Sequence, residues 1–179
     1  MQVTKVAIDG VLVLEPRVFG DARGFFSESF NRQAVEAAAG LSVDFVQDNH
    51  SKSARDVLRG LHFQLAPKAQ GKLVRVIQGE VFDVAVDIRK DSPTYGKWHG
   101  EILSAENRKQ MWIPAGLAHG FLVLSETAEF LYKTTDYYAP ALERCLRWDD
   151  PELNIAWPLD GRQPLVSDKD AQGVSFDQL

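Results

Sequence analysis

Four histidines are the side chains of this chain that most directly suggest proton-transfer chemistry. Imidazole has a reference pKa of about 6.5, so a histidine can accept and return a proton at neutral pH. His62 lies in the sequence LRGLHFQ, which reads as a β-strand. In a strand, His62 shares one face with Gly60 and Gln64, while its two apolar neighbours take the other face. This polar row can face a barrel interior or solvent, and its glycine favours a functional role for His62.

His119 ends a second motif, Pro-x-Gly-x-x-His, that begins at Pro114. The spacing predicts a turn leading into a strand. It resembles the second motif of the cupin superfamily, whose histidine points into the barrel and often binds a metal. A cupin metal site also needs a His-x-His motif followed by a glutamate. Here Gln64 replaces the second histidine, and residues 67–69 contain no glutamate. Two of the four ligands are too few for a stable site. We therefore expect no metal and no cofactor, although Asp83 could still join as a ligand, and a metal-dependent oxygenase is the weaker alternative.

The remaining candidates for chemistry are less persuasive. We expect His50 to lie in a loop and to bond the backbone, and His99 to lie on a surface strand. Cys145 is the only cysteine, so no internal disulfide can form. Its strand-like surroundings favour a small buried apolar residue and leave a catalytic thiol as the weaker alternative.

Short strands separated by Gly, Pro and Asn turns must position these side chains. Residues 81–88 alternate, with Asp83 and Asp87 on the face opposite Phe82 and its apolar partners. Residues 73–77 precede them across Gln78-Gly79, which we expect to be a hairpin turn. Further strands are predicted at residues 57–64, 111–113, 121–124, 129–135 and 144–148.

Helices are few in this sequence. One is predicted over residues 33–39, with Asn31 as its N-cap and Gly40 at its end. A short turn is expected from Ser104. Many short strands with few helices indicate a mainly β double-sheet roll or barrel. Because such sheets leave edges to cover, we expect a homodimer.

Length and charge narrow the function further. The 179 residues suit one domain, residues 1–179, with a substantial core. A net charge of −5 without a block of lysine and arginine argues against nucleic acid as a partner. The apolar run at residues 11–14 is too short for a membrane span and has no signal-peptide flanks, so we expect a cytoplasmic protein with no membrane partner.

Eight stretches in order carry a more specific resemblance. They are FGDARGFFSESF (19–30), FVQDNHS (45–51), LRGLHFQ (58–64), QGKLVR (70–75), GEVFDVAVD (79–87), IPAGLAHGF (113–121), EFLYK (129–133) and SDKD (167–170). Together they resemble the dTDP-4-dehydrorhamnose 3,5-epimerases over almost the whole chain. The resemblance implies a cupin-like jelly roll, usually dimeric, that needs no metal. It also implies the substrate dTDP-4-dehydro-6-deoxy-D-glucose, a dTDP-linked 4-keto-6-deoxy sugar inverted at C3 and C5 on the route to dTDP-L-rhamnose.

The same resemblance implies roles for four catalytic residues. His62 is the base that removes a proton beside the ketone, and Asp170 is its carboxylate partner, with Asp168 as the alternative two residues away. Tyr132 is the acid that returns a proton to the other face, although a core tyrosine is the rival interpretation. Lys72 neutralises the enolate oxygen, a role that suits a point charge, or else it is an ordinary solvated lysine.

Binding residues follow from the resemblance too. Cations anchor the diphosphate, and polar or aromatic groups hold the sugar and base; the matched positions are Arg23, Phe26, Glu28, Gln47, Asn49, Arg59, His119, Tyr138, Glu143 and Lys169. Asp83 is expected to support the histidines or Lys72 from behind. Arg59 and His62 are an odd number apart, so a regular strand would send them to opposite faces. Both reach one site if Gly60 forms a bulge, which we prefer, or if Arg59 precedes the strand.

Two further functions compete with this interpretation. A single-centre epimerase or a ketoisomerase on a related dTDP-4-keto sugar would use the same proton chemistry with a different pocket shape. A non-catalytic sugar-binding or nucleotide-binding domain on the same roll would bind ligand without hydrogen exchange.

Overall fold

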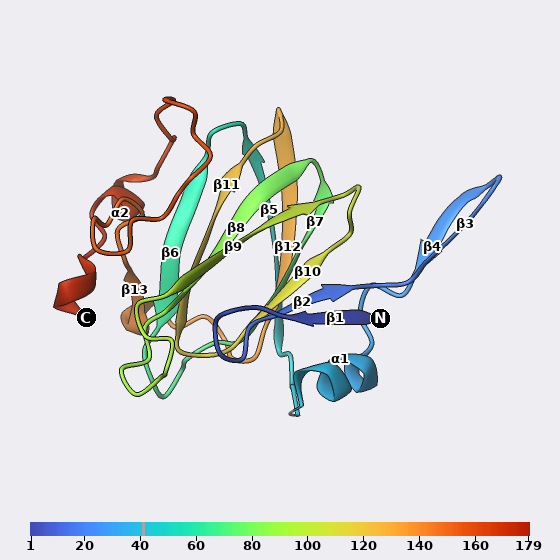
Figure 1. Ribbon diagram of the computed structural model, residues 1–179, viewed down its shortest axis with the longest axis horizontal. Helices are drawn as coiled ribbons and strands as arrows, with labels where there is room; N and C mark the ends of the chain where they lie inside the picture. Colours follow the sequence, from blue (N-terminus) through green and yellow to red (C-terminus); the bar gives the residue numbers. More distant parts are fainter. Residues whose placement is uncertain (41) are drawn as a thin grey trace.

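Two antiparallel sheets packed face to face make up the body of the molecule in the computed structural model, which describes residues 1–40 and 42–179 (Figure 1). The six-stranded sheet runs in the order β1 (Gln2–Lys5), β2 (Leu12–Glu15), β10 (Gln110–Ile113), β7 (Lys72–Gln78), β12 (Thr127–Thr134) and β5 (Gln47–Ala54). The five-stranded sheet runs β13 (Glu143–Cys145), β6 (Leu58–Gln64), β11 (Leu117–Val123), β8 (Glu80–Asp87) and β9 (Trp98–Ser104). The mainly β double-sheet roll expected from the sequence is therefore confirmed.

The core between the sheets follows from the two-residue period of the strands. Val74 and Phe130 point inward from the six-stranded sheet, and Val81, Ala85 and Phe121 point inward from the five-stranded sheet. The rings of Phe121 and Phe130 stack with centroids 4.2 Å apart. These apolar side chains fill only part of the space, because polar inward-facing residues occupy the remainder.

The outer face of the six-stranded sheet is covered by α1 (Arg32–Ala39), which buries Val35. The Asn31 side chain accepts a hydrogen bond from the Ala34 amide at 3.1 Å, and Gly40 ends the helix at φ 68°. These are the cap and the stop that the sequence predicts, so this helix is confirmed.

The chain after β13 covers the outer face of the five-stranded sheet (Figure 1). This segment contains α2 (Asp168–Ala171) and ends in η2 (Phe176–Gln178), whereas the short turn η1 (Pro140–Leu142) lies just before β13. Leu146, Leu153 and Phe176 pack on Val84 and Val86. Strand β8 is consequently buried on both faces, and Asp83 on its inner face has no exposed surface.

A separate two-stranded ribbon, β3 (Val18–Asp21) and β4 (Gly24–Ser27), projects away from the sheets (Figure 1). Its aromatic side chains are strongly exposed: Phe19 by 51%, Phe25 by 62% and Phe26 by 68%. An isolated ribbon with such side chains is not stabilised by its own core. The three rings therefore leave an exposed apolar surface on the ribbon.

Some predictions for local structure were right and others wrong. The turn after Ser104 is confirmed, because Ser104 and Asn107 exchange side-chain to backbone hydrogen bonds of 3.0 Å. His99 lies in β9, as expected. The hairpin at Gln78-Gly79 is wrong: β7 and β8 belong to different sheets, and Gly79, at φ 76°, carries the chain between them.

Within residues 1–40 and 42–179, no helix is long and apolar enough to cross a membrane.

Candidate active site

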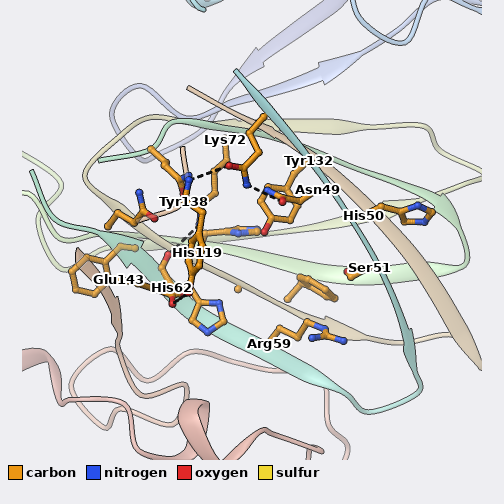
Figure 2. A pocket seen from close by; sticks show the side chains of 16 residues that line it. Asn49, His50, Ser51, Arg59, His62, Lys72, His119, Tyr132, Tyr138 and Glu143 are labelled. Carbon is orange, nitrogen blue, oxygen red and sulfur yellow. Dashed lines mark hydrogen bonds between the residues drawn. The ribbon is translucent and has the colours of Figure 1, made fainter. Parts of the chain in front are cut away.

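A pocket of about 430 Å³ opens between the two sheets (Figure 2). One wall is formed by β5, β7 and β12 of the six-stranded sheet, and the other by β6, β11 and β13 of the five-stranded sheet. The volume is in the range of small-molecule sites. Nine of the predicted site residues line it: Gln47, Asn49, Arg59, His62, Lys72, His119, Tyr132, Tyr138 and Glu143.

His62 and Asp170 form a hydrogen-bonded pair at this pocket. The His62 Nε2 and Asp170 Oδ1 atoms are 2.6 Å apart, and the Asp170 side chain is buried. Burial opposes ionisation of Asp170, but hydrogen bonds from His62 and the Gly60 amide outweigh it and lower the pKa of this carboxyl. With Nε2 engaged, Nδ1 is the nitrogen of His62 that can accept a proton. Asp168 is exposed, so Asp170 is the aspartate that reaches His62.

A bulge in β6 brings Arg59 to the same pocket as His62. The pairing with β11 matches His119 to His62 and Phe121 to Arg59, so two residues of β6 oppose Gly120 alone. Gly60 has φ 119°, and a Cβ placed there would lie 2.6 Å from the Gly120 Cα atom. Only glycine fits such a close approach of two backbones. The predicted bulge at Gly60 is confirmed.

Tyr132 and Lys72 face His62 from the other wall (Figure 2). The Lys72 ammonium group is buried and donates a hydrogen bond to the His62 carbonyl oxygen at 3.2 Å. Burial lowers the pKa of Lys72 to about 8, although the negative charges of Asp83 and Glu143 oppose this shift. Burial also raises the pKa of Tyr132, with Glu143 adding to the effect, so the phenol keeps its proton.

His119 and Asp83 form a second, deeper pair. His119 Nε2 lies 3.1 Å and 2.9 Å from the two carboxylate oxygens of Asp83, and both side chains are buried. Burial lowers the pKa of His119 more than the Asp83 charge raises it. The ring is therefore a neutral donor and acceptor at the base of the pocket. Asp83 lies behind a pocket histidine, where the sequence placed it.

Hydrogen bonds fix the polar groups at the mouth of the pocket. The Tyr138 hydroxyl donates to Glu143 at 2.7 Å, and Lys169 forms an ion pair with the same carboxylate. The Gln47 side chain accepts from the Tyr138 amide at 3.0 Å and donates to Asn49 at 3.0 Å. The predicted binding residues on this side thus form one connected group.

Three predicted binding residues lie elsewhere in the chain. Arg23 and Phe26 are on the projecting ribbon, and Glu28 follows it. The Arg23 side chain is 90% exposed and pairs with Asp21. Within a single protomer, the described structure does not bring these residues into the pocket.

Gln64 occupies the position of the second histidine in the cupin metal-binding pattern and has a structural role there. Its side-chain nitrogen donates to the carbonyl oxygens of Lys68 at 2.6 Å and Tyr137 at 3.2 Å, and its oxygen accepts from the Ala139 amide at 2.8 Å. Gln64 therefore holds the loops at the mouth, and its polar atoms are already engaged. The donors that remain from the cupin pattern, His62 and His119, are each bonded to an aspartate.

Sequence reasoning missed several pocket residues, and one prediction was wrong. His50 lies in strand β5, not in a loop, and its side chain bonds Glu129 at 3.0 Å. Ser51 and Gln70 line the pocket without having been predicted. The signal was present, because Gln47, Asn49 and Ser51 recur every second residue, as a polar strand face requires.

Comparison with known proteins gives consistent similarities. The family model described as dTDP-4-dehydrorhamnose 3,5-epimerase matches residues 5–178. The chain is 66% identical to the dTDP-4-dehydrorhamnose 3,5-epimerase of Pseudomonas aeruginosa and 61% identical to that of Shigella flexneri, covering 98% of this chain and 96% of each relative. A crystal structure of dTDP-6-deoxy-D-glucose-3,5-epimerase from Legionella pneumophila, in complex with dTDP-4-keto-L-rhamnose, superposes with a TM-score of 0.95 at 52% identity, covering 99% of this chain and 94% of that one.

Proposed function

Because the chain belongs to the dTDP-4-dehydrorhamnose 3,5-epimerase family, we propose that it converts dTDP-4-dehydro-6-deoxy-D-glucose into dTDP-4-dehydro-L-rhamnose. The observation that carries this proposal is the arrangement of His62 and Tyr132 on opposite walls of one pocket. Inversion requires that a proton leave one face of a carbon and that another arrive on the opposite face. A base and an acid on facing sheets supply this geometry.

His62 starts the reaction by removing the proton from the carbon beside the ketone. The free Nδ1 atom accepts this proton, and the Asp170 carboxylate at Nε2 stabilises the imidazolium that forms. The C4 oxygen then carries the negative charge of an enolate. Lys72 reaches from the opposite wall, and its buried ammonium group would neutralise this oxygen, because a fixed charge is most effective in a site shielded from water.

Tyr132 completes each inversion by giving a proton to the opposite face, and between the two inversions His62 releases its proton to solvent while Tyr132 takes one up. Its raised pKa keeps the phenol protonated until the enolate forms. The two carbons C3 and C5 flank the same ketone, so one enolate-stabilising group serves both inversions. His119, neutral and held by Asp83, adds a hydrogen-bonding group at the base of the pocket.

The diphosphate and the nucleoside bind at the mouth. Arg59 donates its Nε proton to Ser53 at 3.0 Å, which leaves the outer nitrogens of its guanidinium free for phosphate oxygens. Lys169 provides a second cation, and Gln47, Asn49, Tyr138 and Glu143 hold the sugar and base.

We also propose a homodimer in which the β3–β4 ribbon of one protomer reaches the pocket of its partner. This arrangement would cover the exposed Phe19, Phe25 and Phe26 rings and deliver Arg23 and Glu28 as binding residues. The chain would act as one domain, residues 1–179, in the cytoplasm. Mixing R23A and H62A proteins tests the arrangement, because mixed dimers would regain one intact pocket and part of the activity. Two inactive proteins that stay inactive after subunit exchange would contradict it.

Hydrogen exchange measured by NMR tests the proposed function. Purified protein is incubated with dTDP-4-dehydro-6-deoxy-D-glucose in deuterated water, without added metal. Deuterium at both C3 and C5, with the L-rhamno product, is the expected result. Label at one carbon alone would instead identify a single-centre epimerase, and a moved carbonyl a ketoisomerase. Absence of label would leave a binding module.

A further inference from the structure

The Cys145 thiol lies beside the His62–Asp170 pair and takes no part in the proposed proton transfer. Cys145 is paired with His62 in the register of β13 and β6, and its Sγ atom is 3.8 Å from Asp170 Oδ1. One donor atom from each of His62, Cys145 and Asp170 lies within 4.8 Å of the others. A nitrogen, a thiol sulfur and a carboxylate oxygen so close together are the donor types that zinc prefers.

We propose that His62, Cys145 and Asp170 form an inhibitory zinc site at the catalytic base. Zinc would bind His62 Nε2, Cys145 Sγ and one Asp170 oxygen, and a water molecule on the pocket side would complete a tetrahedron. This site is separate from the cupin pattern of metal ligands, because two of its three donors, Cys145 on β13 and Asp170 on α2, lie outside the two cupin motifs. The inhibitory effect rests on the function proposed above, whereas the binding of zinc does not.

The existing geometry needs little change to accept the ion. Bond lengths of about 2.0–2.3 Å around a tetrahedral zinc place neighbouring ligand atoms about 3.3–3.8 Å apart. The separation of Cys145 Sγ and Asp170 Oδ1, 3.8 Å, already fits. The 2.6 Å contact between His62 and Asp170 must open, because the ion takes the place of the proton between them, and the His62 and Cys145 donor atoms, which lie within 4.8 Å of each other, must come to about 3.5 Å. Asp170 is held in place by hydrogen bonds to Gly60 and Ser167, so the ligand set is ordered before the ion arrives.

Zinc binding changes the net charge of this site by only one unit. Burial and the nearby Asp170 charge raise the pKa of the Cys145 thiol to about 12, so without metal the sulfur stays protonated and unreactive. A bound dication reverses this preference, since a coordinating thiol loses its proton to solvent. The thiolate and the Asp170 carboxylate then cancel the two charges of zinc, so the net charge of the site changes from −1 to 0 and neighbouring Lys72 and Lys169 meet no net positive charge.

Inhibition follows from the protonation of imidazole. A neutral imidazole that binds zinc through Nε2 carries its proton on Nδ1. That proton occupies the position that must accept hydrogen from the substrate. Zinc-bound His62 is therefore inactive as a base, and the loss of activity reaches about tenfold when free zinc is about ten times its Kd.

Cobalt provides a test that does not depend on turnover. Because Cys145 is the only cysteine, a cobalt–thiolate charge-transfer absorption during titration with Co²⁺ can come from no other residue. We expect the wild-type protein to show this band and C145S to lack it. A wild-type protein that shows no band in excess cobalt would overturn the zinc site, whether or not the chain is an epimerase.

The hydrogen-exchange assay then connects the site to activity. C145S and C145A should keep the basal exchange rate in metal-free buffer, because the thiol transfers no proton. Both variants should need at least about 10–100 times more zinc for half inhibition, because loss of a direct ligand weakens binding at least as much as loss of a group that only supports a ligand. A chelator should restore the wild-type rate. Equal zinc sensitivity in wild type and both variants would place the inhibiting ion elsewhere and refute the proposal.

Discussion

The substitution Asp170→Asn tests the contribution of the carboxylate to the base. The side chains are nearly the same size, and asparagine keeps an oxygen that can accept the Gly60 amide hydrogen bond now made at 3.2 Å. What disappears is the negative charge next to His62, whose Nε2 atom is 2.6 Å from the carboxylate. With charge centres about 4 Å apart and an effective dielectric constant of about 20, the lost attraction to an imidazolium is about 4 kcal/mol. This energy corresponds to a decrease in kcat of about 10³-fold.

The measurement is the rate of deuterium incorporation at C3 and C5 under saturating substrate, with dTDP affinity determined separately by calorimetry. Affinity should change little, because the Asp170 carboxylate accepts hydrogen bonds from His62 and Gly60 and would not contact the diphosphate. Asp168→Asn is the matched control: it removes the same charge two residues away from an exposed position, and it should leave kcat within a factor of about two. D170N retaining more than a tenth of the activity, or D168N losing as much as D170N, would contradict this role of the Asp170 charge.

Three further predictions concern the opposite wall and the bulge. Tyr132→Phe should slow or stop inversion at one or both carbons while hydrogen exchange persists, because the base still acts. NMR measures inversion from the product and exchange from the deuterium label. Loss of all exchange would instead assign Tyr132 to deprotonation. Activity should decline as pH rises through about 8, because Lys72 loses the proton that neutralises the enolate; a pH–kcat profile that stays flat to pH 10 would contradict this role, and Lys72→Arg should remove the decline at a lower plateau. Gly60→Ala should lower the free energy of unfolding by about 2–4 kcal/mol, because Gly60 has a positive φ and its new Cβ would lie 2.6 Å from the Gly120 backbone. Denaturant unfolding measures this loss. Gly20→Ala is the control: its Cβ would lie 3.7 Å from the nearest atom, so it should unfold near the wild-type midpoint.

Local features of the sequence predicted much of the secondary structure. Residues 81–88 alternate, and the strand formed with its aspartates on the expected face. The helix begins after Asn31, whose side chain caps it, and ends at Gly40, whose backbone adopts the left-handed conformation. These features depend on neighbours a few residues apart, so the sequence alone contains the needed information. His50 was misplaced because the polar row around it was interpreted as a loop, and the hairpin at Gln78-Gly79 was wrong because a turn residue does not specify which sheet the next strand joins.

The motifs, read together, also indicated the family and most of the pocket residues. Their order along the chain pointed to His62, Tyr132 and Lys72, and the structure brings all three to one cavity. The Gly60 bulge could be inferred because Arg59 and His62 otherwise face opposite ways. The position of Arg23 could not be judged in this manner, since a matched motif does not reveal which ribbon carries it or how far that ribbon projects from the sheets.

The strand pattern, the helix caps and the identity of the reactive side chains could thus be predicted before the fold was known, because each depends on local periodicity or on a short motif. The folded chain shows that Asp170, 108 residues beyond His62, and not Asp168, bonds the imidazole. It also shows that Cys145 lies beside both. Such contacts depend on strand register and on the packing of the C-terminal segment against the sheet. Register and packing depend on the shape of the whole core, so they cannot be predicted from any short stretch of residues.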